Sequence, residues 1–146
     1  MYRVFNRVHV HFVWATWDRL PLLVDEAVRR AVHACIAAKC KELGCEPLAV
    51  GGVEDHVHLL ARLYQTVAMS DLIGDVKGAS SHMANREYRV DPELRWQRGY
   101  SAVSVSPGGI DRVKSYIVSQ PEHHRDRSLI GTLEDLGAAN DADDER

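Results

Sequence analysis

The spacing of apolar residues changes along this chain between a repeat of two and the wider spacing of a helix, and this change constrains the fold most. Apolar side chains occupy every second position from Val8 to Trp14, which predicts a strand ending near Thr16. From Asp25 to Leu43 they recur every three or four residues. That spacing predicts an amphipathic helix of about five turns that stops at Gly44. The chain therefore begins with a strand and a helix.

The rest of the chain continues in the same way. Further strands are predicted at residues 47–53, 56–63 and 100–104, and further helices at 70–88, opened by Ser70, and from Pro107 onward, capped by Ser106. Pro121 is expected to kink or end the last helix.

This order, β-α-β-β-α-β, matches the split βαβ topology of ferredoxin-like and RRM-like folds. We therefore predict an α+β fold with an antiparallel sheet and an additional C-terminal helix that carries Tyr116. In this topology the first and third strands are the central pair. The strand that starts at His56 is then a natural floor for a site.

Length and composition allow one domain. The chain has 146 residues, of which 45% are hydrophobic and 27% charged, and this excludes wholesale disorder. No apolar run is long enough for a membrane span or a signal peptide, so a cytoplasmic protein without a membrane partner is expected. Three cysteines lack metal-site spacing, and Cys35 falls on the predicted core face of a helix, which indicates buried thiols in a reducing compartment.

The net charge of −3 comes from the end of the chain. The last 13 residues, 134–146, hold six acidic side chains and one arginine, and they are expected to form a disordered tail. Residues 1–133, which we expect to form the folded domain, carry 17 basic and 15 acidic side chains. Any nucleic-acid site must therefore depend on where the charges are placed.

The sharpest local motif is a pair of histidines in the third predicted strand. His56 and His58 are two residues apart, so their side chains project from the same face of the strand. Two imidazoles so placed can bind one divalent metal ion together, although a pair of hydrogen-bonded histidines on a sheet face fits the spacing too. A second pair, His9 and His11, lies on the first strand and competes for this role. The acidic turn before His56 favours the later pair, and structural or substrate-contact roles are expected for the earlier one.

The last helix carries a candidate nucleophile. Tyr116 and Gln120 are four residues apart, which places them on one helix face. A lone helical tyrosine is usually a packing residue. Beside a metal held by two imidazoles and an amide oxygen, however, its hydroxyl can attack a phosphate.

Candidate nucleic-acid contacts are spread over several segments. Lys77, Ser81 and Arg86 belong to a polar, partly basic helix face, which solvation alone also explains. Arg98 lies beside Trp96 in a segment where stacking on bases competes with ordinary core packing. His123 and His124 follow the tyrosine helix and suit either a polar helix end or a phosphate contact.

Together these residues resemble a known family, the single-tyrosine HUH transposases of the insertion-sequence 200/605 group, including the relatives associated with REP sequences. The similarity extends from about residue 9 to 125. It rests on His11-Phe-Val-Trp14 with Thr16, Gly51-Gly-Val-Glu-Asp-His-Val-His-Leu-Leu60, Ser70-Asp-Leu72, Lys77-Gly-Ala-Ser-Ser81, Trp96-Gln-Arg-Gly-Tyr100, Ser104-Val-Ser-Pro107 and Tyr116-Ile-Val-Ser-Gln-Pro-Glu-His-His-Arg125.

The resemblance implies a role for each matching residue. It implies that His56, His58 and Gln120 bind Mg²⁺ or Mn²⁺ and that Tyr116 is the nucleophile. It further implies a homodimer that acts on single-stranded hairpin DNA at the ends of a mobile element. Tyrosine attack leaves a 5′-phosphotyrosine and a free 3′-hydroxyl, and rejoining excises or inserts the element. Of the earlier histidine pair, His11 is a candidate DNA contact.

The chain departs from the family pattern in three places. Trp17 and Asp18 stand where a basic residue is common, Pro121 follows Gln120, and the acidic tail replaces a closing helix after Arg127. Two other functions stay open. One is a domesticated protein that binds hairpin DNA without strand transfer. The other is a hydrolase whose metal is held by His56, His58 and one of the later histidines, His123 or His124, with water as the nucleophile.

Overall fold

The computed structural model describes residues 4–120, and it contains the seven predicted elements in the predicted order. The four strands are β1 (His9–Ala15), β2 (Glu46–Gly52), β3 (His56–Arg62) and β4 (Ser101–Val105). The three α-helices are α1 (Glu26–Glu42), α2 (Met69–Glu87) and α3 (Ile110–Val118). Two short 3₁₀ turns, η1 (Trp17–Arg19) and η2 (Pro107–Gly109), precede α1 and α3. Pro121, the predicted domain end at residue 133 and the acidic tail lie outside the described residues.

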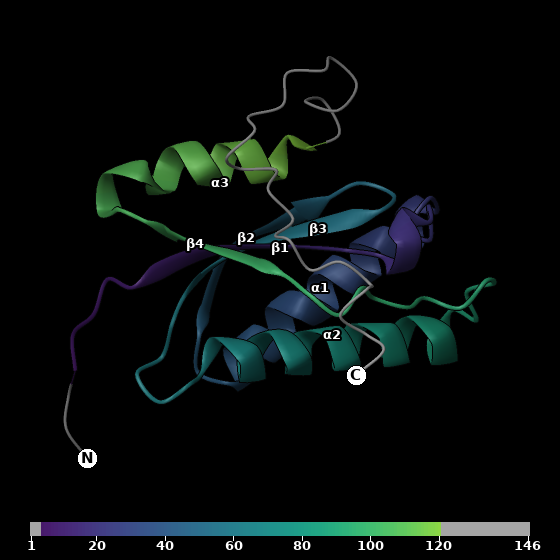
Figure 1. Cartoon of the computed structure of the whole chain (residues 1–146), viewed down its shortest axis with the longest axis horizontal. Coiled ribbons are helices and arrows are strands. Elements are labelled where there is room, and N and C mark those ends of the chain that lie inside the picture. The colour runs from purple at the N-terminus through teal and green to yellow at the C-terminus, as the bar shows by residue number, and fades with distance from the viewer. Residues whose placement is uncertain (1–3, 121–146) are drawn as a thin grey trace.

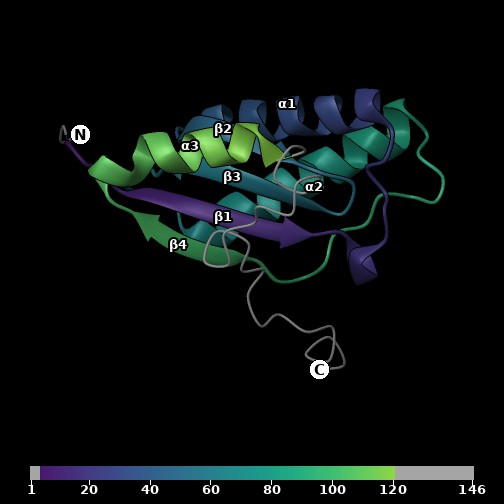
Figure 2. The same cartoon turned by 90° about the horizontal axis from the view of Figure 1, so that it is seen from above.

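The strands form one antiparallel sheet in the order β2-β3-β1-β4, which confirms the predicted α+β fold with β1 and β3 at its centre. Figure 2 shows β1 running beside β4. The register places His58 opposite Val13 and His56 opposite Ala15. On the other side of β1, His11 pairs with Val103 of β4.

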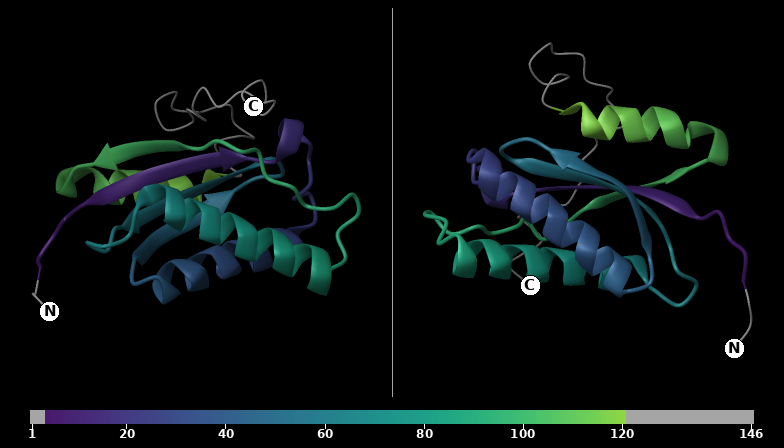
Figure 3. Two further views of the ribbon diagram at one scale, coloured as in Figure 1. Left: turned by 60° about the horizontal axis from the view of Figure 1, so that its bottom comes forward. Right: turned by 180° about the vertical axis from the view of Figure 1, so that it is seen from behind.

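The sheet is covered on both faces. Helices α1 and α2 lie on one face and α3 lies on the other (Figures 1 and 3). Successive side chains of each central strand point to opposite faces of the sheet. Phe12 and Trp14 of β1 and Val57 and Leu59 of β3 enter the main core under α1 and α2. A smaller apolar cluster lies under α3 and contains Ala49, Leu60, Val113 and Ile117.

Helix α1 begins at a strong cap. The carboxylate of Asp25 accepts hydrogen bonds from the backbone N–H groups of Ala27 and Val28, which satisfies two donors that the first turn leaves open. The chain leaves the helix through Gly44, whose φ of +86° is a conformation that glycine adopts without strain. No helix of the described residues is long and apolar enough to cross a membrane.

Three local expectations were wrong. Cys35 is only half-buried, because the buried stripe of α1 runs through Val28, Val32, Ile36 and Cys40 at intervals of four. Helix α2 is not opened by Ser70: it begins at Met69, and Ala68 supplies no side-chain cap. Ser106 makes no capping hydrogen bond either, and residues 107–109 form a 3₁₀ turn before α3 begins at Ile110.

Candidate active site

Three imidazoles gather on the α3 side of the sheet. His56 and His58 of β3 and His11 of β1 are each no more than 1% exposed. Their side chains point to the same side because they occupy alternate positions of neighbouring strands. The rings of His56 and His58 have centroids 5.1 Å apart. The sheet therefore holds both histidines of the strand motif together, out of bulk water.

The two histidine pairs of the sequence do not compete for one position. Nε2 of His11 lies 2.9 Å from Nδ1 of His58, and the two rings stack with centroids 5.1 Å apart. His9 lies two residues further from this cluster along β1, and its Nδ1 is 3.1 Å from the backbone oxygen of Arg7. His11 thus supports the pair on β3.

A carboxylate contacts the first histidine from the turn before β3. Oδ1 of Asp55 lies 2.8 Å from Nδ1 of His56, and Oδ2 lies 3.2 Å from the guanidinium of Arg19. Burial by itself would raise the pKa of Asp55. The hydrogen bond to His56 and the positive charge of Arg19 outweigh burial and hold that pKa below its usual value. Asp55 is therefore an anion at neutral pH.

The turn that carries Arg19 is tied to the same carboxyl residue. The backbone N–H of Thr16 donates to the backbone oxygen of Asp55 at 2.9 Å, and the Thr16 hydroxyl lies 3.2 Å from that oxygen. Asp18 and Arg19 have φ values of 53° and 54°, which is uncommon for residues other than glycine. Sequence reasoning missed Arg19. The position of Asp55 directly before His56 was the signal available for the carboxylate.

Helix α3 brings Tyr116 to the histidines. The Tyr116 side chain is 3% exposed, and its ring centroid lies 6.0 Å from that of His58. The helix can approach because β2 carries Gly51 where α3 crosses it. A β-carbon at Gly51 would stand 2.2 Å from the backbone oxygen of Ile117. Tyr116 therefore lies against His58 of the same chain.

Ser119 breaks the helix between Val118 and Gln120, and Gln120 is again helical. Helix α3 ends at Val118, two residues before Gln120, so the predicted shared helix face holds only in part. The Gln120 side chain is fully buried, and its amide nitrogen lies 3.4 Å from the backbone oxygen of Tyr116. The structure thus places Gln120 next to the tyrosine.

These side chains form a suitable donor set for a divalent cation. Imidazole nitrogens and an amide oxygen are all neutral metal ligands, and the Asp55–His56 contact is the outer-shell partner that metal-binding histidines usually have. Within residues 4–120, no three His, Cys, Asp or Glu side chains are arranged as a metal centre. A cation here would therefore need the Gln120 oxygen together with water or phosphate oxygens.

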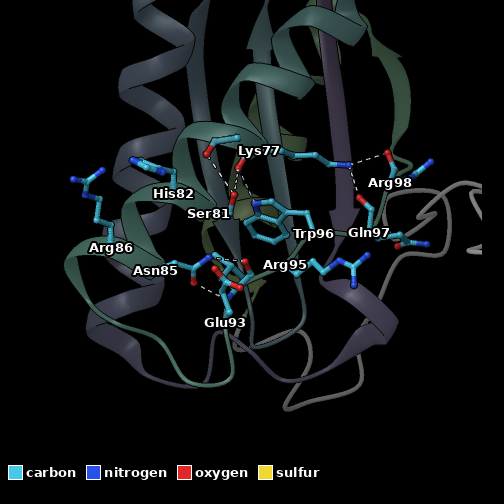
Figure 4. Close-up of a pocket in the computed structure, with 12 residues that line it drawn as sticks. Lys77, Ser81, His82, Asn85, Arg86, Glu93, Arg95, Trp96, Gln97 and Arg98 are labelled. Atoms are coloured by element: carbon cyan, nitrogen blue, oxygen red, sulfur yellow. Dashed lines mark hydrogen bonds between the residues drawn. The ribbon is translucent and has the colours of Figure 1, made fainter. Parts of the chain in front are cut away.

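A second candidate site lies beside α2, the helix on the opposite face of the sheet from α3. It is a cavity of about 770 Å³ between α2 and the segment before β4 (Figure 4). Its lining consists of Lys77, Gly78, Ser81, His82, Asn85, Arg86, Glu93, Leu94, Arg95, Trp96, Gln97 and Arg98. Four of these side chains are cations and one is a carboxylate, so the cavity suits an anion.

The predicted DNA contacts divide between the two sites. Ser81, Arg86 and Arg98 line the cavity with Lys77, whereas His11 lies beside His58. The Lys77 ammonium contacts three backbone oxygens, those of residues 97, 98 and 99, at 2.7, 3.1 and 2.8 Å, and burial lowers its pKa to about 8. Lys77 thus fixes the backbone of residues 97–99 beside α2. His123 and His124 lie outside the described residues.

Trp96 lines the cavity, but most of its side chain is buried in the core. Its side chain is buried, its indole N–H lies 3.2 Å from the Lys77 backbone oxygen, and its ring meets Trp14 edge to face. An exposed guanidinium, that of Arg95, lies over the ring of Trp17 at 3.7 Å. Of the two interpretations left open for Trp96, core packing is the one that the structure supports.

Comparison with known proteins gives a consistent result. Residues 4–120 match the model of the family described as "Transposase IS200 like". The chain is 27% identical over 122 residues to the ISDra2 transposase TnpA of Deinococcus radiodurans, an alignment that covers 78% of this chain and 84% of that protein.

Two solved structures share the fold. One is a crystal structure from D. radiodurans R1 described as a transposase, with a TM-score of 0.64 and 24% identity over 80% of this chain and 94% of the other. The second is a REP-associated tyrosine transposase bound to a REP hairpin. Its TM-score is 0.62 and its identity 16%, over 85% of this chain and 73% of the other.

Proposed function

This chain belongs to the IS200-like family of transposases, and from that membership we propose that it cuts and rejoins single-stranded DNA through Tyr116. The observation that carries the proposal is the meeting of Tyr116 with His58 on one buried face of the sheet, at a ring-centroid distance of 6.0 Å. A packing tyrosine needs no such neighbour. The family and the geometry thus support the same residue.

In the proposed reaction the Tyr116 hydroxyl oxygen attacks the scissile phosphorus. A bond forms between that oxygen and phosphorus while the bond from phosphorus to the 3′-oxygen breaks. The tyrosine proton is balanced by the proton that the leaving 3′-oxygen gains, so the products are a 5′-phosphotyrosine and a 3′-hydroxyl. Attack by a 3′-hydroxyl reverses the step and joins strands, which would excise or insert a mobile element.

The chain's own residues would hold the cation that the family resemblance implies. His56, His58 and Gln120 are proposed to bind Mg²⁺ or Mn²⁺, which would polarise the phosphate and stabilise its developing charge. His58 also packs against the tyrosine ring and so fixes its direction of approach.

The cavity beside α2 is the proposed contact surface for the DNA backbone. The exposed guanidinium groups of Arg86, Arg95 and Arg98 suit phosphate oxygens (Figure 4). A solved structure with the same fold holds a REP hairpin, so hairpin DNA is the proposed ligand here as well. We propose the cytoplasm of a bacterial or archaeal cell as the location of this activity, because the chain belongs to the IS200-like family of transposases.

We also propose that the chain forms a homodimer through β4. This strand lies at one edge of the sheet, and its middle residues, 102–104, are exposed. An open edge can pair with the same edge of a second copy and extend the sheet. Sedimentation of the protein should then give a mass of two chains. The Val103→Pro variant should sediment with the mass of a single chain.

The decisive experiment is denaturing electrophoresis of the protein with end-labelled single-stranded hairpin DNA, in Mg²⁺, Mn²⁺ or EDTA. We expect an adduct that survives denaturation in either metal, is lost in EDTA and is absent from Tyr116→Phe. Tyr88→Phe is the matched control, since Tyr88 is exposed and lies at the end of α2. Adducts that persist in Tyr116→Phe would overturn the assignment of the nucleophile.

One alternative has a specific observation in its favour. The cationic cavity is separate from the histidine site, so hairpin binding without strand transfer is a coherent function for the chain. Retarded DNA that is never trapped covalently, in any metal, would support this function. A metal-dependent hydrolase is distinguished by cleavage without an adduct and by indifference to Tyr116→Phe.

A further inference from the structure

Both histidines of the strand motif are held through the same ring nitrogen, Nδ1. Nδ1 of His56 lies 2.8 Å from the carboxylate of Asp55, and Nδ1 of His58 lies 2.9 Å from Nε2 of His11. Both rings are at most 1% exposed, whereas the Asp55 side chain is 21% exposed. The two partners come from different places, one from the turn before β3 and one from β1.

The first contact fixes the location of a proton. A carboxylate only accepts hydrogen bonds, so the nitrogen of His56 that faces Asp55 must be the donor. A neutral imidazole carries one N–H, so the lone pair of His56 is then on Nε2. The contact therefore selects the form of the ring that binds a cation through Nε2.

The second contact joins two imidazoles, and in their neutral forms only one of the two can donate to the other. If His58 is to bind a cation through Nε2, its Nδ1 must carry the proton, and Nε2 of His11 must then accept it. We propose that His11 and Asp55 are positioning residues that hold His58 and His56 in the Nδ1–H form, which presents both Nε2 atoms to the same cation. This inference rests on the proposed function.

The surroundings of Asp55 keep its carboxylate in place. Arg19 contacts the oxygen that His56 does not use, with Nε and one terminal nitrogen each at 3.2 Å. Thr16 contacts the backbone of Asp55 through both its N–H and its hydroxyl. The left-handed turn at Asp18 and Arg19 is thus part of the support for His56.

The direct test is ¹⁵N NMR of the histidine rings in the cation-free protein, since ring nitrogen shifts distinguish the two neutral forms. In the wild type we expect Nδ1–H for both His56 and His58. His11→Gln keeps an acceptor, the side-chain oxygen, and should leave His58 unchanged. His11→Leu removes the acceptor and should convert His58 to a mixture or to the Nε2–H form. An Nε2–H form of His58 in the wild type would overturn the proposal for His11.

The second test is Mn²⁺ binding measured by calorimetry, with folding of each variant checked by thermal unfolding. We expect His11→Leu and Asp55→Leu to weaken Mn²⁺ binding roughly 10- to 100-fold, the usual cost of removing an outer-shell partner. His11→Gln and Asp55→Asn keep an accepting oxygen and should stay within a few-fold of wild type. His9→Leu is the control on the same strand and should bind as wild type does.

The outcomes separate the two levels of the proposal. A wild-type protein that binds no Mn²⁺ overturns the metal site of the proposed function, and this inference with it. A wild type that binds Mn²⁺ no more tightly than His11→Leu and Asp55→Leu do overturns this inference alone. Weak binding in the leucine variants that Gln and Asn do not restore would assign His11 and Asp55 to packing and equally overturn it.

Discussion

The backbone oxygen of Ile117 lies so close to Gly51 that a β-carbon on that glycine would stand 2.2 Å from it. No side chain can yield in this contact, because both partners are backbone. The closeness of β2 and α3 therefore depends on the missing side chain of Gly51. Since Tyr116 is the residue before Ile117, the same glycine controls where the proposed nucleophile lies relative to His58.

We predict that Gly51→Ala displaces α3 and lowers both stability and adduct formation. Overpacking of this kind costs roughly 1–3 kcal/mol of unfolding free energy, measurable by urea denaturation. The rate of adduct formation should fall at least about tenfold, because a small misplacement of a nucleophile is costly. Gly74→Ala is the matched control, because Gly74 lies on α2 outside the cavity. Nothing lies within 4 Å of its β-carbon position on α2, and alanine is the better helix former, so that variant should gain about 0.5–1 kcal/mol. Unchanged adduct formation in Gly51→Ala would show that the close approach does not position Tyr116.

A second prediction concerns Lys77. Replacing it with methionine leaves the backbone oxygens of residues 97–99 without their ammonium donor, which should cost roughly 1–3 kcal/mol in unfolding free energy. Lys39→Met is the control, because Lys39 makes an ion pair with Glu42 on the surface of α1, and its replacement should change stability by less than about 0.5 kcal/mol. Equal stability of the two variants would show that the three hydrogen bonds of Lys77 add nothing.

A third prediction concerns DNA affinity. Replacing Arg86 and Arg98 together with alanine should weaken hairpin binding. The slope of log affinity against log salt should fall by roughly 0.7–0.9 for each phosphate that the protein then leaves unneutralised. Fluorescence anisotropy between 50 and 200 mM salt measures both quantities (roughly the range where such effects are large). Arg30→Ala is the control, since Arg30 is paired with Glu26 on α1. An unchanged salt slope in the double variant would remove the cavity from the DNA interface.

The fourth prediction is a dependence of stability on pH. Burial, with a smaller effect from the charge of Arg29, lowers the pKa of His33 from 6.5 to about 4. Its Nε2 is buried without a hydrogen-bond partner among the described residues. Between pH 6.5 and 4 the unfolded chain binds a proton at this residue that the folded chain does not, so stability rises with pH across this window and is lost as the pH falls.

His33→Leu should remove that part of the pH dependence. Acidification from about pH 6.5 to 4 should lower the unfolding free energy of the variant by roughly 2 kcal/mol less than that of the wild type. Urea unfolding at each pH measures this difference. His82→Leu changes an exposed histidine on α2 and is the control. Parallel pH profiles for wild type and His33→Leu would contradict the assignment.

The sequence predicted the elements well because their apolar periods are regular. The strand bounds differ from the prediction by a residue or two, and the central pair β1 and β3 is as expected. The exact burial stripe was harder to predict. Spacing of three or four residues allowed Cys35 on the buried side of α1, but the stripe follows intervals of four and selects Cys40.

Contacts that depend on register were beyond the sequence. His11 reaches His58 because β1 and β3 pair with Val13 opposite His58, and an isolated sequence pattern does not encode that offset. Arg19 reaches Asp55 through a turn with positive φ at two residues that are not glycine. In the sequence Lys77 has the features of an ordinary surface lysine. Only the fold shows that its ammonium contacts three backbone oxygens.

Strand β1 contributes to both sides of the molecule with one alternating set of residues. His11 serves the histidine cluster, while Phe12 and Trp14 fill the core beneath α1 and α2. Deletion of Val13, with Trp14 and the pairing after it kept, would move the residues before it to the opposite side of the sheet. The imidazole of His11 would enter the hydrocarbon interior, and the ring of Phe12 would stand on the side where the cation is expected. The alternation within β1 therefore leaves no room for a deletion of odd length.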